Sequence, residues 1–158
     1  MNPQYQACAG YNQSPINIER VISAELAALH FNYKTSASDI VQLPHTVQIN
    51  FHQGSYLSLE GERFQLLQMH LSPSENMIKG KSFPMELHLV HASEKGELAV
   101  VAVMYEAGKK NLTLERLWQQ RQSKKGLSLR ANEFLPATHG YYRFNGSLTT
   151  PPCTESVR

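Results

Sequence analysis

The sequence predicts a mainly β domain with one or two short helices. Several segments alternate apolar and polar residues with the two-residue period of a strand that has one buried face. Two other segments are almost continuously apolar, which is typical of strands covered on both faces. Proline and glycine recur through the remainder, so long loops are expected between the strands.

The alternating segments are expected to be strands that have one face on the core. They span residues 46–51, 56–60 and, less strictly, 63–71. Turn residues such as Gly54 and Gly61 bound them. The two more apolar segments, 86–91 and 98–105, are expected to form the middle of the sheet.

Only the segment 112–118 has the periodicity of a helix. Asn111 is suited to cap its amino end, and the helical period places Leu114, Leu117 and Trp118 on one face. The segment is short, so this helix is expected at the periphery of the domain.

Composition is that of a single globular domain over residues 1–158, of which 41% are hydrophobic. The net charge is +2 and no basic block could follow a phosphate backbone, so nucleic acid is not an expected partner. No apolar run approaches the roughly 20 residues that span a bilayer, so no membrane is expected either. Residues 1–6 lack the basic start and apolar stretch of a signal peptide, which predicts a cytoplasmic location for the chain as written.

Two cysteines, Cys8 and Cys153, stand near opposite ends of the sequence. They are too few and too far apart for a zinc knuckle or a redox Cys-x-x-Cys motif. Either they pair and close a loop that contains most of the chain, or they are two free buried thiols. Their spacing does not decide between these alternatives.

Histidines in the predicted strands are the candidate chemical groups. His88 interrupts an apolar strand and shares a face with Glu86, because residues two apart in a strand point the same way, while His91 faces the other side. A histidine ring held by a carboxylate or amide, with its second nitrogen toward a cavity, is how zinc ligands are commonly oriented. Taken alone, a hydrogen-bonded core histidine is the simpler interpretation of His88.

His70 stands near the end of the preceding predicted strand, on the same face as Gln68. If residues 72–84 connect the two strands as a hairpin, His70 lies beside His88. Catalytic zinc commonly takes three protein ligands and one water, so two histidines alone indicate a metal site only weakly.

Four segments in order resemble the α-carbonic anhydrases, especially bacterial and secreted members. They are residues 12–18, 73–75, 84–91 and 145–152, which read NQSPINI, PSE, PMELHLVH and NGSLTTPP. The resemblance implies a large, twisted, mostly antiparallel sheet with a few short peripheral helices, around a conical cavity with Zn²⁺ at its floor. In that family the zinc lowers the pKa of its bound water to about 7, and the hydroxide converts carbon dioxide to bicarbonate.

The resemblance also implies roles for the residues near the metal. His70 and His88 correspond to zinc ligands, and Gln68 and Glu86 correspond to the residues that orient the ligand rings. Thr149 corresponds to the hydroxyl that orients the zinc-bound hydroxide.

Further positions match the cavity around the metal. Glu75 corresponds to the carboxylate that accepts the hydrogen bond of Thr149, and His45 to the proton shuttle at the cavity mouth. The positions of the carbon dioxide pocket and its polar side are Val90, Val100, Leu148, Val157 and Thr150. Without the resemblance, His45 is simply an exposed histidine, and the valines and Leu148 are ordinary core residues. Thr149 and Thr150 then form a rigid turn before two prolines.

Cys8 and Cys153 correspond to a disulfide found in many exported members of the family. This implies an oxidising, periplasmic or extracellular location, in contrast to the absence of a signal peptide in residues 1–6. Family members usually begin earlier and continue for several strands beyond residue 158. Without those parts, uncovered strand edges predict poor solubility.

The segment after His70 departs from the family pattern. The family places two ligands as His-x-His on one strand, but the stretch between His70 and Glu75 is one residue short, and the absent residue is the second histidine. If the strand keeps its register, Ser72 occupies that position, where a neutral hydroxyl is a poor zinc ligand. The sequence therefore leaves three alternatives. They are a zinc lyase, an inactive relative that keeps the cavity as a binding scaffold, and a nonfunctional fragment.

Overall fold

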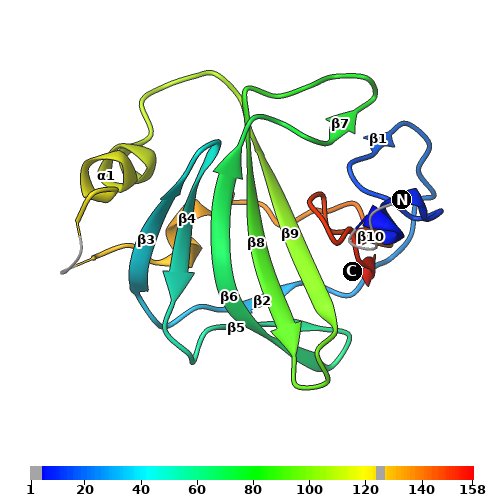
Figure 1. The fold of residues 1–158 in the computed structure, drawn as a ribbon, viewed down its shortest axis with the longest axis horizontal. Helices are drawn as coiled ribbons and strands as arrows, with labels where there is room; N and C mark the ends of the chain where they lie inside the picture. Colours follow the sequence, from blue (N-terminus) through cyan, green and yellow to red (C-terminus); the bar gives the residue numbers. More distant parts are fainter. Residues whose placement is uncertain (1–4, 124–126) are drawn as a thin grey trace.

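The computed structural model describes residues 5–123 and 127–158. A seven-stranded antiparallel sheet dominates this part of the chain (Figure 1). Its strands are β2 (His30–Asn32), β3 (Ala37–Leu43), β4 (Thr46–Phe51), β5 (Tyr56–Leu59), β6 (Glu62–Ser72), β8 (Met85–Ser93) and β9 (Leu98–Tyr105). Two small sheets pair β1 (Asn17–Ile18) with β7 (Met77–Ile78) and β10 (Gly146–Ser147) with β11 (Glu155–Val157). The helical segments are η2 (Ala7–Ala9), α1 (Leu112–Gln120) and η3 (Ala131–Phe134).

The long strand β6 organises the sheet because it pairs with three others. Along one edge its first half pairs with β5 and its second half with β4, and these continue to β2 and β3. Its other edge pairs with β8 over residues 64–72, and β8 pairs in turn with β9. The sheet is curled around this centre, as Figure 1 shows.

The five expected strands are all present, which confirms the mainly β fold class. The sequence missed β2 and β3, whose exposed and polar residues hide the strand period. The expectation that residues 98–105 lie in the middle of the sheet is wrong. β8 is central and largely buried, whereas most of β9 is only half-buried and, within the described residues, its outer edge pairs with no other strand of the main sheet. There, Val100 N donates to Arg158 O over 2.8 Å, and Arg158 N donates to Leu98 O over 3.0 Å.

A β-bulge explains why the alternation in β6 is imperfect. The register against β8 shifts between Leu66 and Gln68, so an extra residue enters the strand. Leu66 and Met69 are both buried although they are three residues apart, and Leu67 between them is 44% exposed. Beyond the bulge, the pairing is continuous to Ser72.

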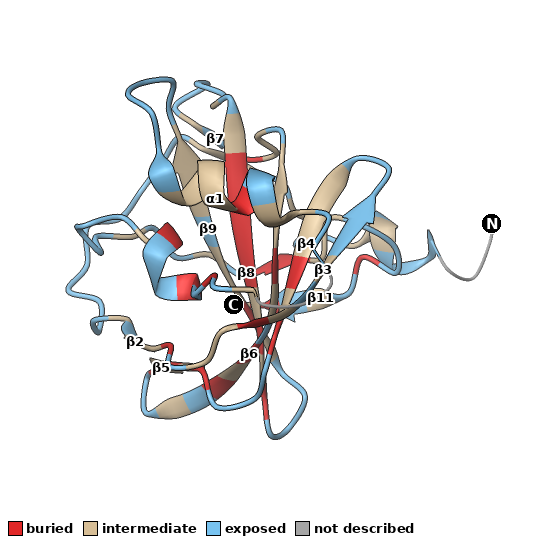
Figure 2. Ribbon diagram, turned by 90° about the vertical axis from the view of Figure 1, so that its left-hand side faces the viewer, coloured by how far each residue is buried: buried red, intermediate tan, exposed pale blue. Residues whose placement is uncertain are grey.

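The main core lies on the face of the sheet opposite the cavity described below. Ile49, Met69, Leu87 and Leu89 are fully buried there, and Figure 2 shows buried residues along β8 and β6. Residues 129–134 pack on this face together with Leu117 of α1. Apolar burial of this kind is worth roughly 25 cal/mol per Å² of surface removed from water.

Helix α1 covers part of this core. Its amino end is capped as expected, since Asn111 Oδ1 accepts from the backbone N–H groups of Thr113 and Leu114. Leu114 and Leu117 pack on the core, whereas Trp118 is 61% exposed and stacks on Arg121. Within the described residues, no helix is long and apolar enough to cross a membrane.

His91 is buried among these core residues and faces away from His88, as the strand period predicts. Its Nδ1 donates to the Ala99 carbonyl over 3.1 Å, so its Nε2 accepts from the Tyr33 hydroxyl, 2.6 Å away. The rings of Tyr33 and His91 are stacked with centroids 5.9 Å apart. Burial lowers the pKa of His91 to about 4, because a protonated ring would lose its hydration.

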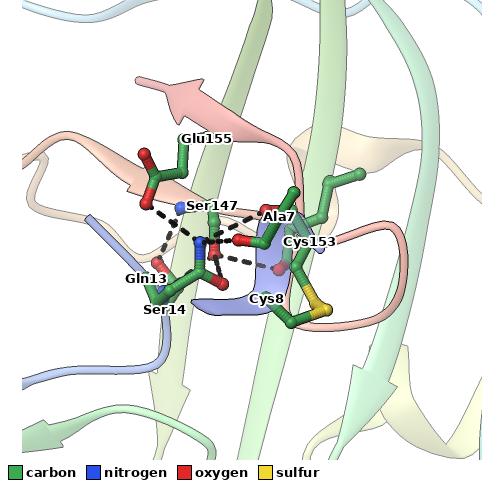
Figure 3. Close-up of a disulfide and its surroundings, with 8 residues drawn as sticks. Ala7, Cys8, Gln13, Ser14, Ser147, Cys153 and Glu155 are labelled. Atoms are coloured by element: carbon green, nitrogen blue, oxygen red, sulfur yellow. Dashed lines mark hydrogen bonds between the residues drawn. A yellow bond between two sulfur atoms is a disulfide. The ribbon is translucent and has the colours of Figure 1, made fainter. Parts of the chain in front are cut away.

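A disulfide joins the two ends of the chain, which confirms the pairing of Cys8 with Cys153. Their Cα atoms are 4.9 Å apart across a sequence separation of 145 residues. Beside it, Gln13 Nε2 donates to the carbonyl of Ala7 and to Glu155 Oε1 over 2.9 and 3.0 Å (Figure 3). The 12–18 segment is therefore an anchor for the loop between β10 and β11.

Removal of the disulfide tests how much this anchor stabilises the fold. A Cys8→Ser/Cys153→Ser variant is expected to lose about 2–5 kcal/mol of unfolding free energy, since the crosslink restricts the unfolded chain. Urea denaturation of the oxidised wild type and the variant measures the difference. A reductant should lower the stability of the wild type only, and equal stabilities of the two proteins would contradict the expectation.

The buried His91 predicts a loss of stability in acid. Between pH 6.5 and pH 4 the unfolded chain binds a proton at this residue that the folded protein does not bind. The unfolding free energy therefore falls as the pH falls through this window, by about 3 kcal/mol from this group alone. A His91→Gln variant, which keeps a polar group for Tyr33, should show a shallower pH dependence in denaturant unfolding. The same pH dependence of the unfolding free energy in both proteins would show that His91 is not its cause.

Candidate functional site

A cavity of about 1080 Å³ lies on the face of the sheet opposite the main core. The sequence-predicted site residues that line it are His45, Gln68, His70, Glu75, His88, Val90, Val100, Leu148, Thr149, Thr150 and Val157. Glu86 is fully buried behind His88. The structure thus brings together residues from β6, β8, β9 and the carboxyl-terminal loops.

His70 and His88 meet at the centre of this group. They are directly opposite each other in the β6–β8 pair, which confirms the expected hairpin. Their rings pack edge to face with centroids 5.0 Å apart, and His70 Nε2 lies 3.1 Å from His88 Nδ1.

The outer nitrogen of each ring is held by a neighbour two residues earlier on the same strand. His70 Nδ1 donates to Gln68 Oε1 over 3.1 Å, and His88 Nε2 donates to Glu86 Oε1 over 2.7 Å. In the neutral tautomers that these bonds select, the lone pairs of His70 Nε2 and His88 Nδ1 face each other. Two lone pairs at that distance are stable only with a positive charge between them, either a proton or a metal ion.

Glu86 is a carboxylate at the centre of a hydrogen-bond cluster. Besides His88, it accepts from the backbone N–H groups of Glu75 and Asn76 over 2.8 and 2.9 Å, and from Asn76 Nδ2 over 2.6 Å. Burial alone would raise the pKa of Glu86, but the bonds from His88 and Asn76 outweigh this and lower the pKa to about 2. Sequence reasoning missed Asn76, whose only signal is a polar residue next to the 73–75 segment.

Burial, together with the neighbouring His88, lowers the pKa of His70. A protonated imidazole there would be poorly hydrated and would repel a second positive ring. His70 is therefore held in the neutral form, which is the form that binds metals.

The two facing nitrogens fit two positions of a zinc site. Zinc–nitrogen bonds of about 2.0–2.1 Å in a tetrahedral arrangement place two ligand atoms ~3.3 Å apart. A third protein ligand is missing: the described ranges 5–123 and 127–158 contain no group of three His, Cys, Asp or Glu residues that could hold a metal ion.

Ser72 stands where the resemblance places the absent histidine. It is on the same face of β6 as His70 and pairs with Glu86, because the strand keeps its register. Its hydroxyl donates to Glu75 Oε1 over 3.4 Å. Among the hydrogen bonds of the described residues, the implied bond from Thr149 to Glu75 does not occur, and the buried Oε2 of Glu75 has no partner.

The remaining predicted residues form the walls and mouth of the cavity. His45 lies in the exposed turn between β3 and β4, and Val90 and Val100 are paired across β8 and β9. Sequence reasoning missed His139, which also lines the cavity and packs edge-on against Phe31 with centroids 5.2 Å apart. It belongs to a segment without regular structure or motif, so no sequence signal pointed to it.

Comparison with known proteins places this fold and cavity in one family. The model of the eukaryotic-type carbonic anhydrase family matches residues 2–158. A carbonic anhydrase of Neisseria gonorrhoeae is 43% identical over 165 residues, which cover 99% of this chain and 66% of that protein. One of Pectobacterium carotovorum is 39% identical and is covered over 68% of its length. The chain thus spans about two thirds of the length of these relatives.

Solved structures agree with the sequence comparison. The α-carbonic anhydrase of Photobacterium profundum is 46% identical with a TM-score of 0.89, over 97% of this chain and 74% of that one. The enzyme of Thermovibrio ammonificans, in complex with the inhibitor sulfanilamide, is 37% identical with a TM-score of 0.91, over 99% and 74% of the two chains. Members of this family are generally zinc-dependent and act on carbon dioxide and bicarbonate. This chain therefore belongs to the eukaryotic-type, or α, carbonic anhydrase family.

Proposed function

We propose that this protein catalyses the reversible hydration of carbon dioxide to bicarbonate, with zinc held by His70 and His88. The observation that carries the proposal is the facing pair His70 Nε2 and His88 Nδ1, 3.1 Å apart on the cavity wall. Each ring is fixed from behind, so both lone pairs are directed before any metal binds. Family membership supports the same activity.

Zinc, when bound, supplies a hydroxide nucleophile by lowering the pKa of its coordinated water to about 7. Gln68 and Glu86 keep the two imidazoles oriented, and the buried charge of Glu86 increases the basicity of His88 toward a metal. Val90, Val100, Leu148 and Val157 offer apolar surface that suits carbon dioxide.

Polar groups around the cavity suit the transfer of protons and the binding of bicarbonate. His45, in its exposed turn, is placed to pass protons between the cavity and solvent. Thr149 and Thr150 add hydroxyls to the cavity wall, where Thr149 would orient the nucleophile. Sulfonamides are expected ligands of the loaded site, since a structural relative was solved with sulfanilamide.

We also propose a periplasmic or extracellular location. The disulfide between Cys8 and Cys153 supports it, because such bonds persist in oxidising compartments.

A second candidate function is a binding scaffold without catalysis. The lack of a third metal-binding group in the described residues and the bond from Ser72 to Glu75 favour it. The hydration rate at full zinc occupancy separates the two candidates, since a scaffold of this kind does not catalyse the reaction.

Metal analysis together with a carbon dioxide hydration assay tests the proposed activity. The purified protein is expected to bind zinc weakly, below one ion per chain, because two imidazoles replace the usual three ligands. Insertion of a histidine between Leu71 and Ser72 should raise both zinc content and hydration rate. The His70→Ala/His88→Ala variant is the control and should have neither.

Two outcomes of this experiment count against catalysis. Background hydration at full zinc occupancy would refute the enzymatic proposal in favour of the scaffold. Zinc binding equal to that of the control variant, with or without the inserted histidine, would refute the metal site itself.

The bond from Gln68 to His70 predicts a measurable effect on zinc affinity. Gln68→Leu removes the acceptor that orients the ring, and losses of about 10–100-fold are typical for such partners. Gln65→Leu is the matched control, because Gln65 is on the same strand and does not line the cavity. Competition with a chromophoric chelator gives both affinities, and equal values would contradict the role of Gln68.

A further inference from the structure

The strand β9 has one open edge. It is the last strand on its side of the main sheet, and β8 pairs with its other edge along its whole length (Figure 1). Arg158 meets the start of the open edge, where it bonds to Val100 N and Leu98 O. Backbone groups of alternate residues in an antiparallel pair point to the same side, so those of Ala102 and Met104 also point outward. Within residues 5–123 and 127–158, no strand or other backbone group pairs with them.

This edge lacks the features that protect the other outer strands of the sheet. β2 is only 3 residues long, and β3 contains Asp39 and a register shift beside it. Short length, charge and bulges all discourage pairing with another chain. β9 is 8 residues long and contains no charged residue, proline or glycine. Its open edge is therefore suited to accept a further strand.

The open part of this edge, residues 101–105, is complementary to itself. It begins beyond the residues that Arg158 occupies and ends with β9 at Tyr105. In an antiparallel pair of two such edges centred on Val103, Val103 lies opposite Val103 of the other copy, and Val101 lies opposite Tyr105. This register uses the whole open stretch of both copies and stops before either Arg158.

Backbone and side chains both favour this register. Ala102 of each copy exchanges hydrogen bonds with Met104 of the other, so the outward groups of both residues find partners. The opposed valine and tyrosine side chains are typical of paired strands, and no like charges face each other. A register centred on Ala102 would instead place Met104 against Val100, where Arg158 already pairs.

We propose that two copies of this chain pair through β9 and form one continuous antiparallel sheet across a two-fold axis at Val103. The occupant of the edge is a second copy because the open stretch is uncharged and matches itself in length and register. Such a contact uses the same surface on both copies, so it closes at a dimer. It requires no metal and is independent of the proposed activity.

Sedimentation equilibrium tests the pairing. At high protein concentration the wild type is expected to have twice the 17.9 kDa mass of one chain. Ala102→Pro removes an outward N–H and keeps the bonds to β8, and Ala102→Lys adds a charge to the edge, so each should weaken dimerisation on the order of tenfold or more. Ala102→Ser keeps the N–H, and Val41→Lys places the same charge on β3, so both controls should dimerise as the wild type does. Thermal unfolding of each variant confirms that it is folded.

Introduced cysteines test the register. Directly opposed residues in a non-hydrogen-bonded antiparallel pair have Cα atoms about 4.5 Å apart, within the range of a disulfide. Val103→Cys should therefore form a disulfide between two copies under mild oxidation. Val101→Cys, the matched control, faces Tyr105 and should crosslink much less. The native Cys8 and Cys153 are already joined to each other and do not compete.

The outcomes decide the inference without reference to zinc. A wild type with the mass of one chain at every concentration would overturn it. A dimer that survives both Ala102→Pro and Ala102→Lys, or that Val41→Lys abolishes, would use another surface and would also overturn it. Crosslinking of Val101→Cys as readily as Val103→Cys would contradict the two-fold axis at Val103.

Discussion

The buried carboxylate of Glu86 is the group on which the site depends. It lies on the central strand β8 with no solvent contact and accepts hydrogen bonds from His88 and from the backbone at residues 75 and 76. A buried charge without such partners would be strongly destabilising, so the strand and the connection after β6 must form together. The same connection is tied to the amino-terminal segment, because Asn76 Oδ1 accepts from Ile16 N over 2.9 Å. One carboxylate thus couples the orientation of a ring in the cavity to the packing of two distant segments.

Much of the sheet could be predicted from the sequence because apolar and polar residues alternate, or apolar residues run continuously, along its main strands. Residues 46–51 and 98–105 match β4 and β9 to the residue. The sequence does not show which strand is central, because that depends on pairing between distant segments. The apolar composition of β9 reflects its role as a cavity wall as well as part of the core. Trp118 illustrates a related limit: the helical period places it correctly on α1 but does not say how far the core extends around that helix.

The parts of the candidate site that depend on residues close together in the sequence could be predicted. Gln68 with His70 and Glu86 with His88 are each two residues apart on a strand, so each pair must share a face. The convergence of the two pairs required the β6–β8 register, and the roles of the other cavity residues came from the family resemblance alone. Asn76 and His139 escaped prediction because loops set their positions, and loop geometry has no period to detect. The partner of Glu75 also escaped prediction: its Oε1 accepts from the Ser72 hydroxyl, three residues earlier at the end of β6.

The contacts of Gln13 affect the order in which parts of the protein fold during translation. Its side chain bonds to Cys153 O and Glu155, residues that are translated more than 130 positions later. At the usual elongation rate of roughly 5–20 residues per second, the amino-terminal segment waits several seconds for these partners. The central strands β4, β6 and β8 can pair during that interval, whereas the loop that carries Thr149 gains its anchor only after residue 155 has been made. This loop is thus added to a sheet whose central strands can already be paired.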